Sequence, residues 1–153
     1  MTRPLVVALS GALLLAGCGG AAEDAGEATD DAMAGFGVPR QTTIDEVTAE
    51  RLPLSGTIEI AGDGCLYLAM DGGARPWIVW PPGAAQGADG GVVTASGEAL
   101  GDGDAVLGVG AVVTLADLPD GADPDSYFGA FGGFCDADAA GVVVLDQVSR
   151  AGG

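Results

Sequence analysis

Residues 54–80 read LSGTIEIAGDGCLYLAMDGGARPWIVW, and this stretch decides the fold class. It holds three short apolar or alternating segments, which we predict to be strands at 57–60, 65–70 and 77–80. Asp63-Gly64, between the first two segments, is a hairpin signal. Pro81-Pro82 ends the third segment, because proline has no N–H to donate to a neighbouring strand. Short strands separated by such turns predict a β-barrel or a β-sandwich.

The same pattern continues to the C-terminus, with further strands predicted at 92–95, 105–115 and 142–145. Gly108 and Gly110 lie in the longest of these segments, where they favour the sharp bend that barrel closure requires. Asp123-Pro124 begins a predicted short helix that ends at Gly132-Gly133. About six strands and one late helix favour a small, partly open β-barrel of the OB type. The alternative is a small β-sandwich.

The chain divides into three predicted regions. Residues 1–17 form a signal peptide, residues 18–41 form a disordered acidic linker rich in alanine and glycine, and residues 42–153 form a single β domain. The linker has too little apolar surface to fold, and its like charges extend it. At the start of the domain, Thr42-Thr43 precedes two acidic residues and predicts a short helix that Leu52-Pro53 ends.

The N-terminus has the parts of a secretory signal, with Arg3 followed by an apolar run over 5–15 and a small-residue cleavage site. This run is much shorter than the roughly 20 residues that span a bilayer. Leu15-Ala16-Gly17-Cys18 resembles the lipobox of bacterial lipoproteins. That resemblance implies cleavage before Cys18 and attachment of diacylglycerol and a fatty acid such as palmitate to this cysteine. Two or more acyl chains hold a protein stably at a membrane. An ordinary secreted protein with a cysteine at this position is the alternative.

The domain itself resembles the small secreted β-barrel domains of uncharacterised bacterial lipoproteins. The resemblance is carried by Cys65, residues 77–81, residues 101–104 and Cys135, and it implies no known active site. The abundance of alanine, glycine and valine, with arginine present and lysine absent, indicates a GC-rich genome, as in actinobacteria.

Charge and composition limit the classes of function. The chain has 22 Asp and Glu against 5 Lys and Arg, a net charge of −17, and no histidine. This balance excludes nucleic acid as a partner, because phosphate binding needs basic side chains. The missing histidine excludes Ser-His-Asp and Cys-His catalytic arrangements and His-ligated zinc. No cofactor is expected, and residues 101–104 do not form a phosphate loop, because no lysine follows them in the right place.

Two cysteines remain if Cys18 is acylated. Cys65 and Cys135 then form an even pair in an exported chain, where disulfides persist. They are not a CxxC motif, and we predict a structural disulfide between them.

Four aspartates close together form a candidate calcium site: Asp117, Asp120, Asp123 and Asp125. Ca²⁺ takes about six to eight oxygen ligands, often from such loops. The alternative is a set of solvated turns, because aspartate before glycine or proline is ordinary turn chemistry.

Four aromatic residues form a candidate ligand pocket: Trp77, Trp80, Tyr127 and Phe131. In this hypothesis the late helix covers the mouth of the barrel above a pocket for a small molecule. The alternative is core packing, since Trp77 and Trp80 lie three apart in a strand and therefore point to opposite faces.

Taken together, the sequence predicts a lipoprotein anchored through Cys18 to the extracytoplasmic face of the cell membrane. We expect it to act by binding an envelope protein or polymer. The alternatives are a module that binds a small ligand or calcium and, less favoured, an enzyme of unidentified chemistry.

Overall fold

The computed structural model describes residues 37–152. The predicted signal peptide, Cys18 and most of the predicted linker lie outside these residues. Within them, no helix has both the length and the apolar character needed to cross a membrane.

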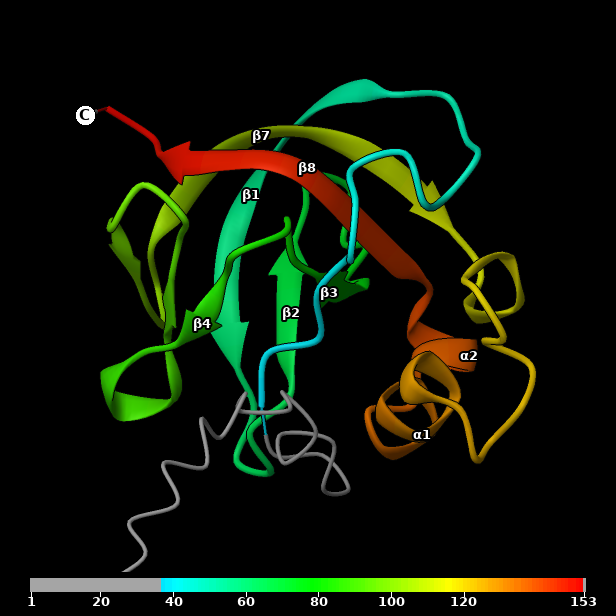
Figure 1. Cartoon of the computed structure of the whole chain (residues 1–153). Helices are drawn as coiled ribbons and strands as arrows, with labels where there is room; N and C mark the ends of the chain where they lie inside the picture. The colour runs from blue at the N-terminus through cyan, green and yellow to red at the C-terminus, as the bar shows by residue number, and fades with distance from the viewer. Residues whose placement is uncertain (1–36, 153) are drawn as a thin grey trace, which may run out of the picture.

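Five strands close into a barrel in the order β1-β2-β3-β8-β7 (Figure 1). They are β1 (Leu52–Ile60), β2 (Leu66–Ala69), β3 (Trp77–Val79), β7 (Ala105–Val113) and β8 (Val142–Arg150). Neighbouring strands are antiparallel except β3 and β8, which run parallel. This order is OB-like, so the prediction of a small β-barrel is confirmed. The barrel is closed, whereas the sequence predicted a partly open one, and the sandwich alternative does not describe it.

A second, three-stranded sheet lies between β3 and β7 in the chain. It contains β4 (Ala85–Gln86), β5 (Val92–Val93) and β6 (Ala99–Leu100), with a 3₁₀ turn at Ala88–Gly90. The sequence predicted the β5 region as a strand because residues 92–94 are all β-branched, but it missed β4 and β6, which have no such run. Val92 and Leu100 of this sheet are buried with the residues of the barrel interior.

Alternate residues of the barrel strands fill two separate cores. The inner core lies inside the barrel and contains Ile58, Leu68, Ile78, Trp80, Val143 and Leu145 among others. The outer core lies on the outside of β2, β3 and β8 and contains Tyr67, Trp77, Val79, Val142 and Val144. Because side chains alternate between the faces of a strand, the apolar run at the start of β8 is buried on both faces.

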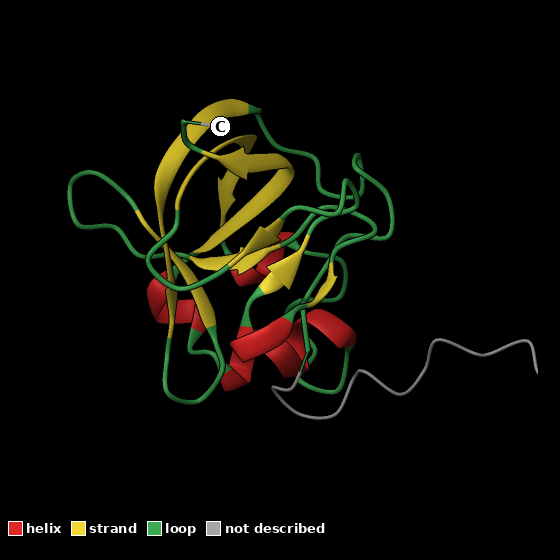
Figure 2. Cartoon of the chain, turned by 90° about the vertical axis from the view of Figure 1, so that its left-hand side faces the viewer, coloured by secondary structure: helices red, strands yellow, loops and turns green. Residues whose placement is uncertain are grey.

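Two helices cover the outer core: α1 (Tyr127–Phe134) and α2 (Ala137–Ala140). They lie beside the start of β8 in Figure 1, and the helical segments, red in Figure 2, occupy the lower part of that view. The late helix is therefore present, but it packs on the outer wall and does not cover the barrel mouth as predicted. It also begins later than predicted, because Asp123 forms a turn with its Oδ1 accepting from Asp125 N, and Ser126 caps the helix by accepting from Gly129 N.

Opposite the predicted bend in the longest segment, the strand pair contains a bulge whose extra residue is Asp146 of β8. The register between β7 and β8 shifts at Val109 and Gly110. A Cβ atom at Gly110 would lie 2.1 Å from the carbonyl oxygen of Val144, so the two strands approach too closely there for any larger residue.

The helix predicted after Thr42 is absent, and residues 42–50 form bends and turns instead. The Arg51 side chain donates to the carbonyl oxygens of Ile44 and Ala49 and so holds the segment in this irregular conformation. The packed domain also begins before residue 42. Val38 and Gln41 are buried, and residue 40 forms a parallel bridge with Trp80.

The predicted disulfide between Cys65 and Cys135 is present and joins the start of β2 to the end of α1. Beside it, the Tyr67 hydroxyl donates to the Cys135 carbonyl oxygen at 2.8 Å. Burial, with a contribution from the nearby Asp63 carboxylate, raises the pKa of Tyr67 above its ordinary value. The hydroxyl carries its proton at neutral pH in any case, and the raised pKa keeps it a donor further into the alkaline range.

Candidate functional site

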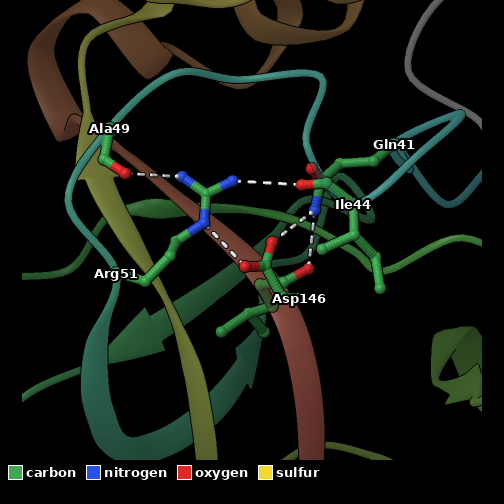
Figure 3. Close-up of polar contacts among 6 residues, drawn as sticks. Gln41, Ile44, Ala49, Arg51 and Asp146 are labelled. Atoms are coloured by element: carbon green, nitrogen blue, oxygen red, sulfur yellow. Dashed lines mark hydrogen bonds and ion pairs between the residues drawn. The ribbon is translucent and has the colours of Figure 1, made fainter.

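A charged cluster fixes residues 41–51 against β8, and it consists of Gln41, Arg51 and Asp146 (Figure 3). Gln41 Nε2 donates to the Leu145 carbonyl oxygen at 2.8 Å and to Asp146 Oδ1 at 3.2 Å. Arg51 Nε donates to Asp146 Oδ2 at 2.6 Å. The two oxygens of one carboxylate therefore hold both ends of the segment.

Arg51 also forms hydrogen bonds with the backbone of the 41–51 segment to which it belongs. Its guanidinium donates to the carbonyl oxygens of Ala49 and Ile44, each at 3.1 Å (Figure 3). The Asp146 side chain is only 9% exposed and the Arg51 side chain 22%. A pair this buried fixes geometry strongly, because neither charge can be left alone without a large desolvation cost.

Next to this cluster lies an open cleft of about 320 Å³, which we call the Ile44–Val148 cleft. Its walls come from the 41–51 segment, the turn after β3, the turn between β5 and β6, and β8. The lining residues are Ile44, Pro81, Pro82, Ala84, Thr94, Ala95, Ser96, Asp146, Gln147 and Val148. Two of the walls touch, since a Cβ atom at Gly83 would lie 3.0 Å from Ala95 Cβ.

The cleft combines apolar walls with a small number of polar groups. Thr94 Oγ1 and Ser96 Oγ lie 2.8 Å apart and share a hydrogen bond. Asp146 accepts two hydrogen bonds from the cluster, whereas an ionised carboxylate has about four acceptor positions. About two acceptor positions of this lining residue are therefore unfilled by the cluster.

Two buried polar atoms in the described part of the chain have no hydrogen-bond partner: Gln41 Oε1 and Trp80 Nε1. Gln41 is 1% exposed and Trp80 is 0% exposed. Their backbones are joined, because Gln41 N donates to the Trp80 carbonyl oxygen at 2.9 Å. Neither residue lines the Ile44–Val148 cleft.

The structure does not gather the four aspartates proposed for calcium, which are Asp117, Asp120, Asp123 and Asp125. Asp117 Oδ2 accepts from the hydroxyl and the amide of Thr114, at 2.7 Å and 2.8 Å, in a capping box. These bonds lower the pKa of Asp117, the hydroxyl bond most. Asp123 Oδ1 caps a turn by accepting from Asp125 N. Across residues 37–152, no three His, Cys, Asp or Glu side chains come together as metal ligands would.

The four aromatic residues of the predicted pocket are divided between the two cores. Trp80 is in the inner core, and Trp77 and Phe131 are in the outer core. Tyr127 packs edge-to-face against Phe131 with centroids 5.2 Å apart, and its hydroxyl accepts from Arg40 N. None of the four lines the Ile44–Val148 cleft. The two tryptophans do point to opposite faces, as their spacing indicated.

The sequence reading missed the cleft because its walls come from four separate parts of the chain. The sequence pattern indicates only a strand end at Pro81-Pro82. One available signal was Asp146, a charged residue placed directly after four apolar residues of a strand buried on both faces. A carboxylate at such a position needs a specific partner.

Comparison with protein-family models, with curated proteins and with solved structures found no match to this chain. No ligand can therefore be transferred to the cleft from a relative.

Proposed function

We propose that this protein is a lipid-anchored lipoprotein of the extracytoplasmic face of the cell membrane, and that its barrel domain acts by binding. The Ile44–Val148 cleft is the proposed binding site. The main support for binding is the form of this cleft. A concave, mainly apolar surface with a few fixed polar groups is the usual form of a ligand site.

The cleft is suited to binding because its walls are held in place before a ligand arrives. The buried Asp146 carboxylate fixes the 41–51 segment, and with it Ile44, through hydrogen bonds from Gln41 and Arg51. A site that is already ordered loses less conformational entropy on binding.

The proposed location rests on the sequence of the N-terminus. A short apolar run followed by Leu15-Ala16-Gly17-Cys18 fits a lipoprotein signal, and lipid on Cys18 would anchor the domain. The bonded Cys65–Cys135 pair also suits an oxidising compartment outside the cytoplasm.

Mass spectrometry of protein extracted from membranes tests the anchor. We expect a chain that starts at Cys18 and carries diacylglycerol and a fatty acid. The C18S variant should carry no lipid and should leave the membrane fraction. Recovery of the wild-type chain without lipid, in the soluble fraction, would refute the proposed location.

An NMR titration with isopropanol, a small neutral probe, tests the binding site. We expect the amide shifts to concentrate on the residues that line the cleft. The I44S variant should weaken these shifts, because it removes a wall residue that is 44% exposed. L107S is the matched control, since Leu107 is 52% exposed and lies outside the cleft. Shifts spread evenly over the surface would count against the cleft as a binding site.

A further inference from the structure

We infer that the Ile44–Val148 cleft receives a lysine side chain from a basic segment of a partner protein. This inference rests on the proposed binding function and names the chemistry of the occupant. Three observations support it: the apolar walls, the buried carboxylate and the distribution of charge over the domain.

The walls suit the stem of a lysine side chain. Ile44, Pro81, Pro82 and Val148 present aliphatic surface to the cleft. A lysine stem of four methylene groups packs on such surface while its ammonium group stays with polar partners.

The polar groups suit the ammonium. Asp146 is a nine-tenths-buried carboxylate on the cleft wall with acceptor capacity left beyond its bonds to Gln41 and Arg51. The hydroxyls of Thr94 and Ser96 and the amide of Gln147 are further acceptors around the cleft. An ammonium group offers three donors and needs acceptors of this kind.

The carboxylate is less suited to an arginine from a partner. Arg51 already holds Asp146 Oδ2 and Gln41 holds Oδ1. Each oxygen therefore keeps about one acceptor position, and a partner guanidinium would need both of these in its own plane for a two-point contact, whereas a compact ammonium needs only one.

The charge of the domain also favours a basic partner. The chain has a net charge of −17. Every arginine in residues 37–152 already bonds within the domain. Arg51, Arg75 and Arg150 form ion pairs, and Arg40 donates to a carbonyl oxygen. The unpaired carboxylates attract and orient a positively charged segment. A second copy cannot supply the side chain, because the sequence contains no lysine.

The test is a titration of the purified chain with three short peptides that differ at one position. The position holds lysine, acetyl-lysine or norleucine, so the aliphatic stem is kept while the charge is removed. Binding is followed by NMR at the amides of the cleft residues. We expect the lysine peptide to bind about tenfold more tightly than the norleucine peptide, which is the effect of one charge-assisted hydrogen bond.

Four variants locate the effect. D146N should weaken binding of the lysine peptide about tenfold, since it removes the charged acceptor. D71N changes the net charge equally at an exposed turn and should have little effect.

I44S should weaken binding several-fold by shortening the apolar wall, whereas L107S should not. Because D146N also weakens the pair with Arg51, its thermal melting is measured alongside, and I44S provides the test should D146N fail to fold.

The outcomes separate the inference from the proposed function. Equal binding of all three peptides in the cleft would refute the lysine assignment and leave a neutral binding site. If D146N and D71N lost equal affinity for the lysine peptide, the role of Asp146 would be refuted. The binding would then reflect only the general attraction of the acidic domain for a positive charge. No shift with any peptide would also refute the inference, while the isopropanol titration decides independently whether the cleft binds at all.

Discussion

Asp146 accepts hydrogen bonds from two side chains that lie 95 and 105 positions earlier in the chain. The negative charge of the carboxylate and the positive charge of the Arg51 guanidinium neutralise each other in a largely buried site. Removing one partner leaves the other charged, buried and unpaired, which is far more costly than the net value of the intact pair.

The R51M variant should lower the free energy of unfolding by about 3 kcal/mol, because it keeps the bulk of the side chain and leaves the buried Asp146 charge unpaired. Chemical denaturation measures the loss. R75M is the matched control, since its pair with Glu59 is about half exposed (45% and 43%). It should cost less than about 1 kcal/mol. Equal losses in the two variants would contradict a structural role for the Asp146 cluster.

Asp117 gives a prediction for acid stability. Hydrogen bonds from the hydroxyl and amide of Thr114 lower its pKa in the folded protein below the ordinary 3.8. A lowered folded-state pKa stabilises the protein above the unfolded-state pKa, and this contribution disappears as the pH falls through the folded-state value.

Wild-type protein should therefore exceed D117A in stability by a constant amount from about pH 7 to about pH 5, and the difference should shrink below about pH 4. Denaturation curves at each pH give this difference. D71A, at an exposed turn, is the control for the loss of one negative charge. A difference that grows on acidification would show that the Thr114–Asp117 capping box is not responsible.

At the scale of the element, α1 shows how neighbouring glycines differ in what they tolerate. A Cβ atom at Gly129 would lie 1.8 Å from the Asp123 carbonyl oxygen. A Cβ atom at Gly133 would meet nothing within 4 Å. Only glycine fits at position 129, because the Asp123 turn lies directly against the backbone there. At position 133 there is room for a side chain, so glycine only lowers the stability of the helix.

The same substitution should have opposite effects at these two positions. G133A should stabilise the protein by about 0.5–1 kcal/mol, because alanine favours a helix over glycine. G129A should destabilise it by about 1–3 kcal/mol through overpacking. Thermal melting of the two variants compares them directly, and a shift in the same direction for both would contradict the packing described for α1.

The long or strongly patterned elements could be predicted from the sequence, and the short ones could not. The segments around β1, β2, β3, β7 and β8 carry alternation or apolar runs, which depend only on local residue order. β4 and β6 pair with β5, and the burial of Val92 in β5 and Leu100 in β6 against the barrel interior is a tertiary effect. Residues 42–50 have local signals for a helix, but the distant Asp146 positions Arg51, whose guanidinium then binds their carbonyl groups.

At the scale of the whole molecule, one disulfide connects the barrel to its helical layer. Cys65 and Cys135 lie 70 positions apart, and both belong to the outer core. The bond was predictable because two cysteines remain if Cys18 is acylated, and two cysteines allow only one pairing. The cleft was not predictable, since no local pattern brings Ile44, Pro82 and Val148 together.

Replacing both cysteines, in the C65S/C135S variant, should lower the free energy of unfolding by about 4 kcal/mol, the loop-closure value for a separation of this length. Wild-type protein melted with reductant should approach the melting temperature of the variant. The variant itself should not respond to reductant, which provides the control. A wild-type melting temperature unchanged by full reduction would contradict a stabilising role for the bond.

The first residues of β8 are buried on both faces, with Val143 and Leu145 in the inner core and Val142 and Val144 in the outer core. This strand is also the last element of the chain, ending at Arg150. Neither core can therefore be completed until residues 142–150 are free to pair with β3 and β7. A chain in which these residues are not yet free to pair lacks the strand that closes the barrel between β3 and β7. Folding of both cores therefore depends on one strand, and neither core can form independently of the other.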